Sequence, residues 1–121
     1  MAPPFDFDAY RAAFEARDVP AWLAFYADDA EWIEYRHTNP PRAPNVMRGR
    51  AEIEAFLERV AAARLTIELS DEVVGAARIA FACTVTFDDS GDRIIEHVIA
   101  DLRDGRIARL AEYFDTRPLV G

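Results

Sequence analysis

Apolar residues recur at helical spacing in the first part of the chain. From Phe7 to Phe14 they return every three or four positions, which predicts a helix over residues 6–17. Asp18 stands just ahead of a proline, a combination typical of a helix start. A second, short helix is therefore expected to begin there and to end near residues 28–29.

The next predicted elements are a strand, a loop and a third helix. Residues 30–36 are rich in aromatic and β-branched side chains and favour a strand. Three prolines within residues 39–44 remove backbone donors and predict a loop. A third helix is expected to open at Gly49. It carries one apolar stripe, formed by Ile53, Phe56, Leu57 and Val60.

The second half of the chain is strand-like. Its runs of Ile, Val, Thr and aromatic residues span 65–74, 78–87, 93–102 and 106–114. The segments between the last three runs, 88–92 and 103–105, have the composition of hairpin turns. Helices followed by an antiparallel meander predict an α+β fold with the helices on one face of the sheet.

Composition narrows the class of protein. The 121 residues are 51% hydrophobic, which suits one domain spanning residues 1–121 with a real core. The formal net charge of −8 disfavours nucleic acid and anionic membrane surfaces as partners. The chain has no apolar run long enough to span a bilayer and no basic-then-apolar start, so a cytoplasmic location is expected. Its single cysteine, Cys83, lies in an apolar run and is expected to be a buried hydrophobe.

Several local patterns, taken in order, resemble those of the nuclear transport factor 2-like superfamily. They are the segment 25–32 at the junction of helix and strand, the glycine-led segment 48–53, and the last hairpin and strand at 104–107 and 112–115. The nearest branch is similar to the SnoaL-like polyketide cyclase group. The resemblance implies a cone-shaped α+β barrel, with three N-terminal helices packed on a strongly curved antiparallel sheet around one pocket.

The resemblance to ketosteroid isomerase within this superfamily implies two site residues. Glu34 lies six residues after Asp28, where that pattern carries its catalytic carboxylate. Such a base removes a proton next to a carbonyl. The alternative is a solvated glutamate or a partner of an arginine. Tyr10 lies where the isomerase carries its oxyanion-donating tyrosine, and the alternative is a core tyrosine.

The alternation of side chains along the 93–102 strand does not decide which of its two faces lines the pocket. The third isomerase residue, a protonated aspartate, falls on Val98 or His97. Either His97 or Glu96 faces the pocket, because neighbouring side chains of a strand point to opposite faces. A pocket histidine is a candidate acid or base, whereas an outward one belongs to the surface or a dimer interface.

A second analogy, to limonene epoxide hydrolase, indicates other residues. Glu112 lies where that enzyme has its water-activating carboxylate. The same alignment turns Tyr35 and His37 inward in place of Glu34. The middle strand, however, lacks the Arg-x-Asp pair that the hydrolase uses, which disfavours epoxide hydrolysis.

The remaining candidates are ligand contacts. The predicted ligand-binding set is Trp32, Tyr35, His37, Phe56, Leu110 and Phe114. An aromatic wall suits a small apolar ligand. No metal is expected, because two histidines and one cysteine without close spacing make a poor ligand set. No cofactor is expected either, since no glycine-rich phosphate loop follows a strand.

Two hypotheses follow. The first is an enzyme of proton transfer on a small apolar carbonyl compound: an isomerase, cyclase or dehydratase using Glu34, His97, Glu112 and Tyr10. The second is a noncatalytic ligand-binding or dimerisation module. In both cases apolar residues on the open sheet face predict a homodimer.

Overall fold

The computed structural model describes residues 4–36 and 43–114. Two helices come first, α1 (Phe7–Ala16) and α2 (Val19–Leu23), and α3 (Gly49–Ala62) follows later. Each of the first two begins at an aspartate whose side chain accepts a backbone N–H: Asp6 from Ala9 at 3.0 Å, and Asp18 from Ala21 at 3.4 Å. These aspartates satisfy donors that a helix start would otherwise leave free.

The sheet has six strands in the order β2-β1-β6-β5-β4-β3. Their bounds are β1 (Tyr26–Tyr35), β2 (Asn45–Arg48), β3 (Leu65–Val74), β4 (Arg78–Phe87), β5 (Arg93–Arg103) and β6 (Arg106–Phe114). The last four form the predicted meander. The first pairs with β2 in antiparallel and with β6 in parallel fashion, so the sheet is mostly antiparallel.

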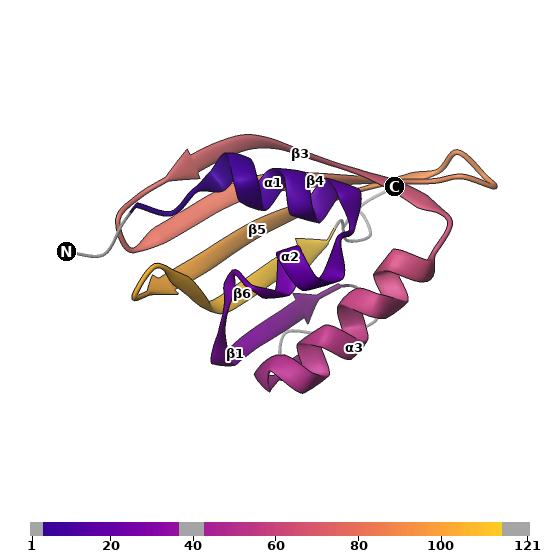
Figure 1. The fold of residues 1–121 in the computed structure, drawn as a ribbon. Helices are drawn as coiled ribbons and strands as arrows, with labels where there is room; N and C mark the ends of the chain where they lie inside the picture. Colours follow the sequence, from indigo (N-terminus) through magenta and orange to yellow (C-terminus); the bar gives the residue numbers. More distant parts are fainter. Residues whose placement is uncertain (1–3, 37–42, 115–121) are drawn as a thin grey trace.

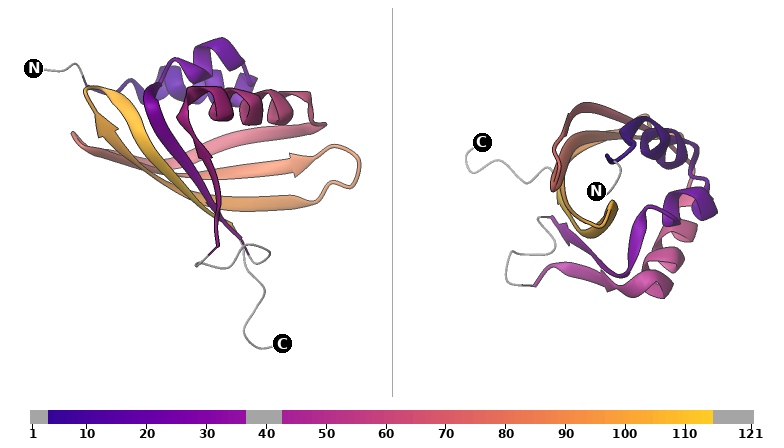
Figure 2. Two further views of the ribbon diagram at one scale, coloured as in Figure 1. Left: turned by 90° about the horizontal axis from the view of Figure 1, so that it is seen from below. Right: turned by 60° about the vertical axis from the view of Figure 1, so that its left-hand side comes forward.

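The sheet is strongly curled, and the helices lie over its open side (Figure 1, Figure 2). The first helix lies against β3 and the third against β1 and β2. Figure 2 shows this ring of sheet and helices end-on. The predicted α+β cone is confirmed, and its inner sheet face and the helices enclose the core.

Two predicted boundaries differ from the structure. The second helix ends at Leu23 rather than near residues 28–29, and Tyr26 already belongs to β1. Tyr26 is fully buried at the start of this strand, where the pairing with β6 shifts register before Glu31. Sequence analysis also missed the short strand β2, because its four residues follow directly on the proline-rich segment. That segment lies mostly outside the described residues.

Two turns depend on backbone conformations that favour glycine. Gly49 has φ +81° where β2 passes into α3, as its predicted position at the helix start requires. Between β5 and β6, Asp104 and Gly105 have φ 53° and 76°. This pair of positive angles is typical of a two-residue hairpin turn, so the hairpin turn predicted at residues 103–105 is confirmed.

Candidate functional site

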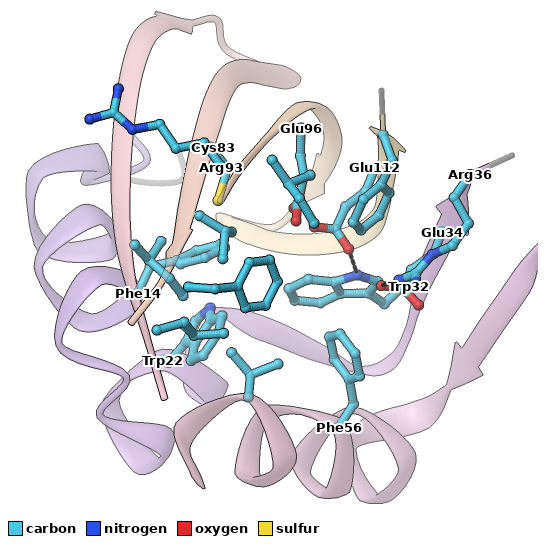
Figure 3. Close-up of a pocket in the computed structure, with 17 residues that line it drawn as sticks. Phe14, Trp22, Trp32, Glu34, Arg36, Phe56, Cys83, Arg93, Glu96 and Glu112 are labelled. Carbon is cyan, nitrogen blue, oxygen red and sulfur yellow. Dashed lines mark hydrogen bonds and ion pairs between the residues drawn. The ribbon is translucent and has the colours of Figure 1, made fainter. Parts of the chain in front are cut away.

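A cavity of about 430 Å³ opens between the inner face of the sheet and the helices. Four aromatic side chains from the helices and β1 line its apolar part (Figure 3): Phe14, Trp22, Trp32 and Phe56. The Trp32 and Phe56 rings meet edge to face, with centroids 5.1 Å apart. Such a wall suits a flat apolar ligand.

Three glutamates form the polar part of this cavity. Glu34, Glu96 and Glu112 are only 3%, 7% and 3% exposed, and all three line it (Figure 3). The strands bring them together: Glu34 pairs with Glu112 across β1 and β6, while Glu96 lies two residues from Val98, the partner of Glu112. Side chains at such neighbouring and diagonal positions on one sheet face are within reach of each other. This polar part is called the glutamate cluster below.

Glu34 is held by two partners. Asn45 of β2 donates its side-chain N–H to Oε1 at 2.8 Å, and Arg36 donates Nη2–H to Oε2 at 3.0 Å. The Arg36 guanidinium also lies over the Phe114 ring, 4.4 Å from its centroid. The carboxylate of Glu34 is therefore oriented and charge-paired despite its burial.

Glu96 and Glu112 are two buried carboxyl groups at diagonal positions of β5 and β6. Burial raises the pKa of Glu112 well above its ordinary value, and the charge of Glu96 raises it further. Burial also raises the pKa of Glu96. Both directions follow from the burial of two neighbouring carboxyl groups, which cannot both ionise cheaply.

Two neutral groups stand beside these carboxyl groups. The indole Nε1–H of Trp32 donates to Oε1 of Glu112. Cys83 lies opposite Glu96 in the pairing of β4 and β5 and also lines the cavity. Burial raises the pKa of the Cys83 thiol, so the group is a neutral thiol rather than a nucleophilic thiolate.

The structure places the predicted site residues in three different surroundings. On the cavity wall lie Glu34, Glu112, Trp32, Phe56 and Phe114. Tyr10 and Leu110 are buried but do not line the cavity. The Tyr10 hydroxyl is hydrogen-bonded to that of Tyr26 at 2.7 Å, and burial raises its pKa. The structure thus favours the alternative reading of Tyr10 as a core tyrosine.

Two other predicted residues are not in the cavity. His97 is exposed on the outer face of β5, so the prediction of a pocket histidine is wrong and Glu96 takes the inward position. Tyr35 also lies on the outer face, where its ring stacks on that of Tyr113 with centroids 5.1 Å apart. The strand phase implied by the hydrolase analogy is therefore wrong, and Glu34 faces inward. His37 lies outside the described residues.

Sequence reasoning missed Asn45 and left Glu96 undecided. Asn45 belongs to the unpredicted strand β2, so no pattern indicated its position. The alternation of Glu96 with Val98 and Ala100 was the available signal, but Ile95 and Ile99 give the opposite face the same apolar character. Within the described part of the chain, no three His, Cys, Asp or Glu side chains are arranged to hold a metal ion, and no helix is long and apolar enough to cross a membrane.

Comparison with known proteins identifies the fold. Similar solved structures include a ketosteroid isomerase of Kribbella flavida, so named only provisionally, with TM-score 0.76 and 17% identity over 95% of this chain and 80% of that one. An NTF2-like protein of unknown function from Burkholderia pseudomallei matches with TM-score 0.73 and 22% identity, over 90% of this chain and 87% of that one. Identities this low establish the shared fold alone.

Sequence comparison is more decisive for the family. No protein with a curated description matches the chain closely enough to count as a relative. The family model of the SnoaL-like domain, in contrast, matches residues 7–110, which span every element from α1 into β6. The chain therefore belongs to the SnoaL-like domain family of the nuclear transport factor 2-like superfamily.

Proposed function

We propose that this protein binds a small apolar carbonyl compound in its cavity and moves a proton on it, as an isomerase, cyclase or dehydratase does. The observation that carries this proposal is the meeting of three buried carboxyl groups with an aromatic wall in one cavity. A site of this kind offers a base and an acid to the same ligand.

Glu34 is the proposed base and Glu112 the proposed acid. Glu34 is paired with the Arg36 guanidinium at 3.0 Å. Glu112 is surrounded by apolar side chains and a second carboxyl group, which favour its protonated form. Carboxyl groups in such different surroundings can divide acid and base roles. Glu34 would remove a proton next to the carbonyl while Glu112 donates a hydrogen bond to the developing oxyanion.

Hydrogen exchange at carbon tests the proposal without knowledge of the natural substrate. A panel of 3-oxo steroids, aromatic ketones and polyketide esters is incubated in D₂O with the protein, and exchange of the hydrogens next to each carbonyl is followed by NMR. The wild type should accelerate exchange in at least one class. Glu34→Gln should abolish this acceleration, and Glu112→Gln should reduce it by roughly 10²–10⁴-fold.

The matched control is Glu68→Gln, which removes the same formal charge from an exposed position on β3. It should leave exchange unchanged. Equal exchange in the wild type and Glu34→Gln would rule out the role of Glu34.

One observation favours the noncatalytic alternative. Both carboxylate oxygens of Glu34 already accept hydrogen bonds, from Asn45 and Arg36, so the group is already engaged by neighbouring side chains. A protein that only binds its ligand would show ligand-induced stabilisation without exchange. The NMR experiment, run beside thermal unfolding with the same ligands, separates the two functions.

We also propose a homodimer formed through the outer sheet face. Ile95, Ile99 and Tyr113 on β5 and β6 are 42%, 39% and 43% exposed, beside the stacked ring of Tyr35. Large apolar side chains gathered on one sheet face favour coverage by a partner. A second copy of this chain would bury them and leave the cavity, on the opposite face, accessible.

A further inference from the structure

Of the two arginines that line the cavity, Arg36 is the one that contacts the glutamate cluster (Figure 3). It directly follows β1 in the chain. Its Nη2–H donates to Oε2 of Glu34 at 3.0 Å, and the Phe114 ring covers one face of the guanidinium, 4.4 Å from the ring centroid. These two contacts hold the guanidinium at the side of the cavity, next to the proposed base.

The described part of the protein uses only some of the donors of this guanidinium. Among the described residues, Arg36 donates to Glu34 alone, and its Nε is buried without a partner. The Arg36 side chain is 39% exposed, so ligand atoms can reach its outer nitrogens. The planar fork of an arginine has more N–H donors than one such contact uses, and a carboxylate matches it with two parallel hydrogen bonds. The unused donors therefore favour a ligand that carries a carboxylate.

Resting on the proposed function, we infer that the ligand is an apolar oxo acid and that Arg36 binds its carboxylate. Because the guanidinium contacts Glu34, a ligand carboxylate on the unused part of the guanidinium lies close to the proposed base. The carbon between the acid and the carbonyl group carries the acidic hydrogens, and in this position it faces Glu34. The guanidinium then stands between two carboxylates and stabilises both.

The surroundings of Arg36 tolerate an acidic ligand. Glu34 is already paired with this arginine. Burial raises the pKa of both Glu96 and Glu112, which reduces the negative charge that the ligand meets. The guanidinium of Arg93, the other arginine of the cavity, extends away from the three glutamates (Figure 3). Arg93 is therefore a matched control, with the same charge in the same cavity but without contact to the glutamate cluster.

Two probes isolate the carboxylate. 4-(2-Naphthyl)-4-oxobutanoate and its primary amide share the ring, the ketone and the shape of the polar end, and they differ in one negative charge. Their dissociation constants are measured at pH 7 by calorimetry for the wild type, Glu34→Gln, the double variant Glu34→Gln/Arg36→Gln and the control Arg93→Gln. Thermal unfolding of each variant without ligand verifies that it is folded.

The double variant is needed because Arg36 also compensates a buried charge. Arg36→Gln alone would leave the Glu34 carboxylate buried without its partner, and that carboxylate would repel the acid for a separate reason. In the Glu34→Gln background this charge is absent. A comparison of Glu34→Gln with the double variant therefore reports the contact between Arg36 and the ligand.

The wild type should bind the acid about tenfold more tightly than the amide, because a partly exposed guanidinium keeps only part of the Coulomb attraction of a buried one. The preference should grow in Glu34→Gln, where Arg36 is released from its charged partner. It should fall below about threefold in the double variant and stay near the wild-type value in Arg93→Gln.

Three results would overturn the inference. Equal binding of both probes to the wild type would do so and leave the pocket function standing, and that comparison needs no variant. A preference retained in the double variant, or lost equally in Arg93→Gln, would show that contact with Arg36 does not select the acid. Binding of neither probe to the wild type would contradict the inference and the proposed function together.

Discussion

Replacement of Glu112 should change how stability depends on pH. In the folded protein, burial and the charge of Glu96 raise the pKa of Glu112 well above its ordinary value of 4.5. The unfolded chain loses this proton near the ordinary value. Between the two values the folded state binds more protons than the unfolded state, so stability is greatest below pH 4.5 for this group and falls as pH rises through the folded pKa.

The size of the change in unfolding free energy follows from the titration of one group. Each pH unit in that window lowers the free energy of unfolding by up to about 1.4 kcal/mol. Glu112→Gln keeps the shape of the side chain and cannot titrate, so it should lack this slope. From pH 5 to pH 7 the wild type should lose up to about 2.7 kcal/mol relative to the variant, if the folded pKa lies above that range.

Urea unfolding at half-unit pH steps measures this difference. The variant shows the pH dependence of stability that comes from other groups. Among these are Asp29 and Glu72, whose arginine partners lower their pKa, so they affect stability at lower pH. Parallel stability curves for wild type and Glu112→Gln between pH 5 and pH 7 would show that Glu112 holds no extra proton, and would refute the reasoning.

Three other perturbations test separate contacts. Trp32→Phe removes the N–H donated to buried Glu112 and should cost about 1–3 kcal/mol in urea unfolding, and a cost near zero would argue against that bond. Ile53→Ala empties a fully buried position of α3 and should cost about 2–5 kcal/mol, whereas the exposed neighbour Glu54→Ala should change stability by less than about 0.5 kcal/mol. Ile99→Lys on the outer sheet face should shift sedimentation from dimer to monomer while ligand binding is retained, and an unchanged sedimentation coefficient would contradict the proposed interface.

The fold was predictable because its signals are local and agree with one another. The aspartate ahead of α2, the glycine at the start of α3 and the turn at residues 103–105 each require a particular backbone geometry, and each lies where it was expected. The second helix was overextended because Phe25 and Tyr26 continue its apolar run, although Tyr26 is buried by the sheet instead.

The site was less predictable for a physical reason. On β5, apolar residues stand at both alternations: Val98 and Ala100 face inward, while Ile95 and Ile99 face outward. When both faces of a strand are apolar, the sequence pattern does not show which face points into the core. Only the tertiary structure could therefore decide between Glu96 and His97.

The carboxyl pair is equally non-local. Glu96 and Glu112 come from neighbouring strands, and the protonation of each depends on the other and on burial. No local sequence pattern distinguishes either residue from an exposed glutamate such as Glu68. The raised pKa of each group thus emerges from packing.

The proton held by Glu112 underlies the proposed acid, so its detection is the most direct test. The infrared difference spectrum of wild type minus Glu112→Gln, recorded at pH 7 without ligand, distinguishes a protonated carboxyl group from an ionised one. The account predicts a protonated carboxyl band in the wild type that is absent from the variant. A spectrum showing only an additional ionised carboxylate in the wild type would contradict it.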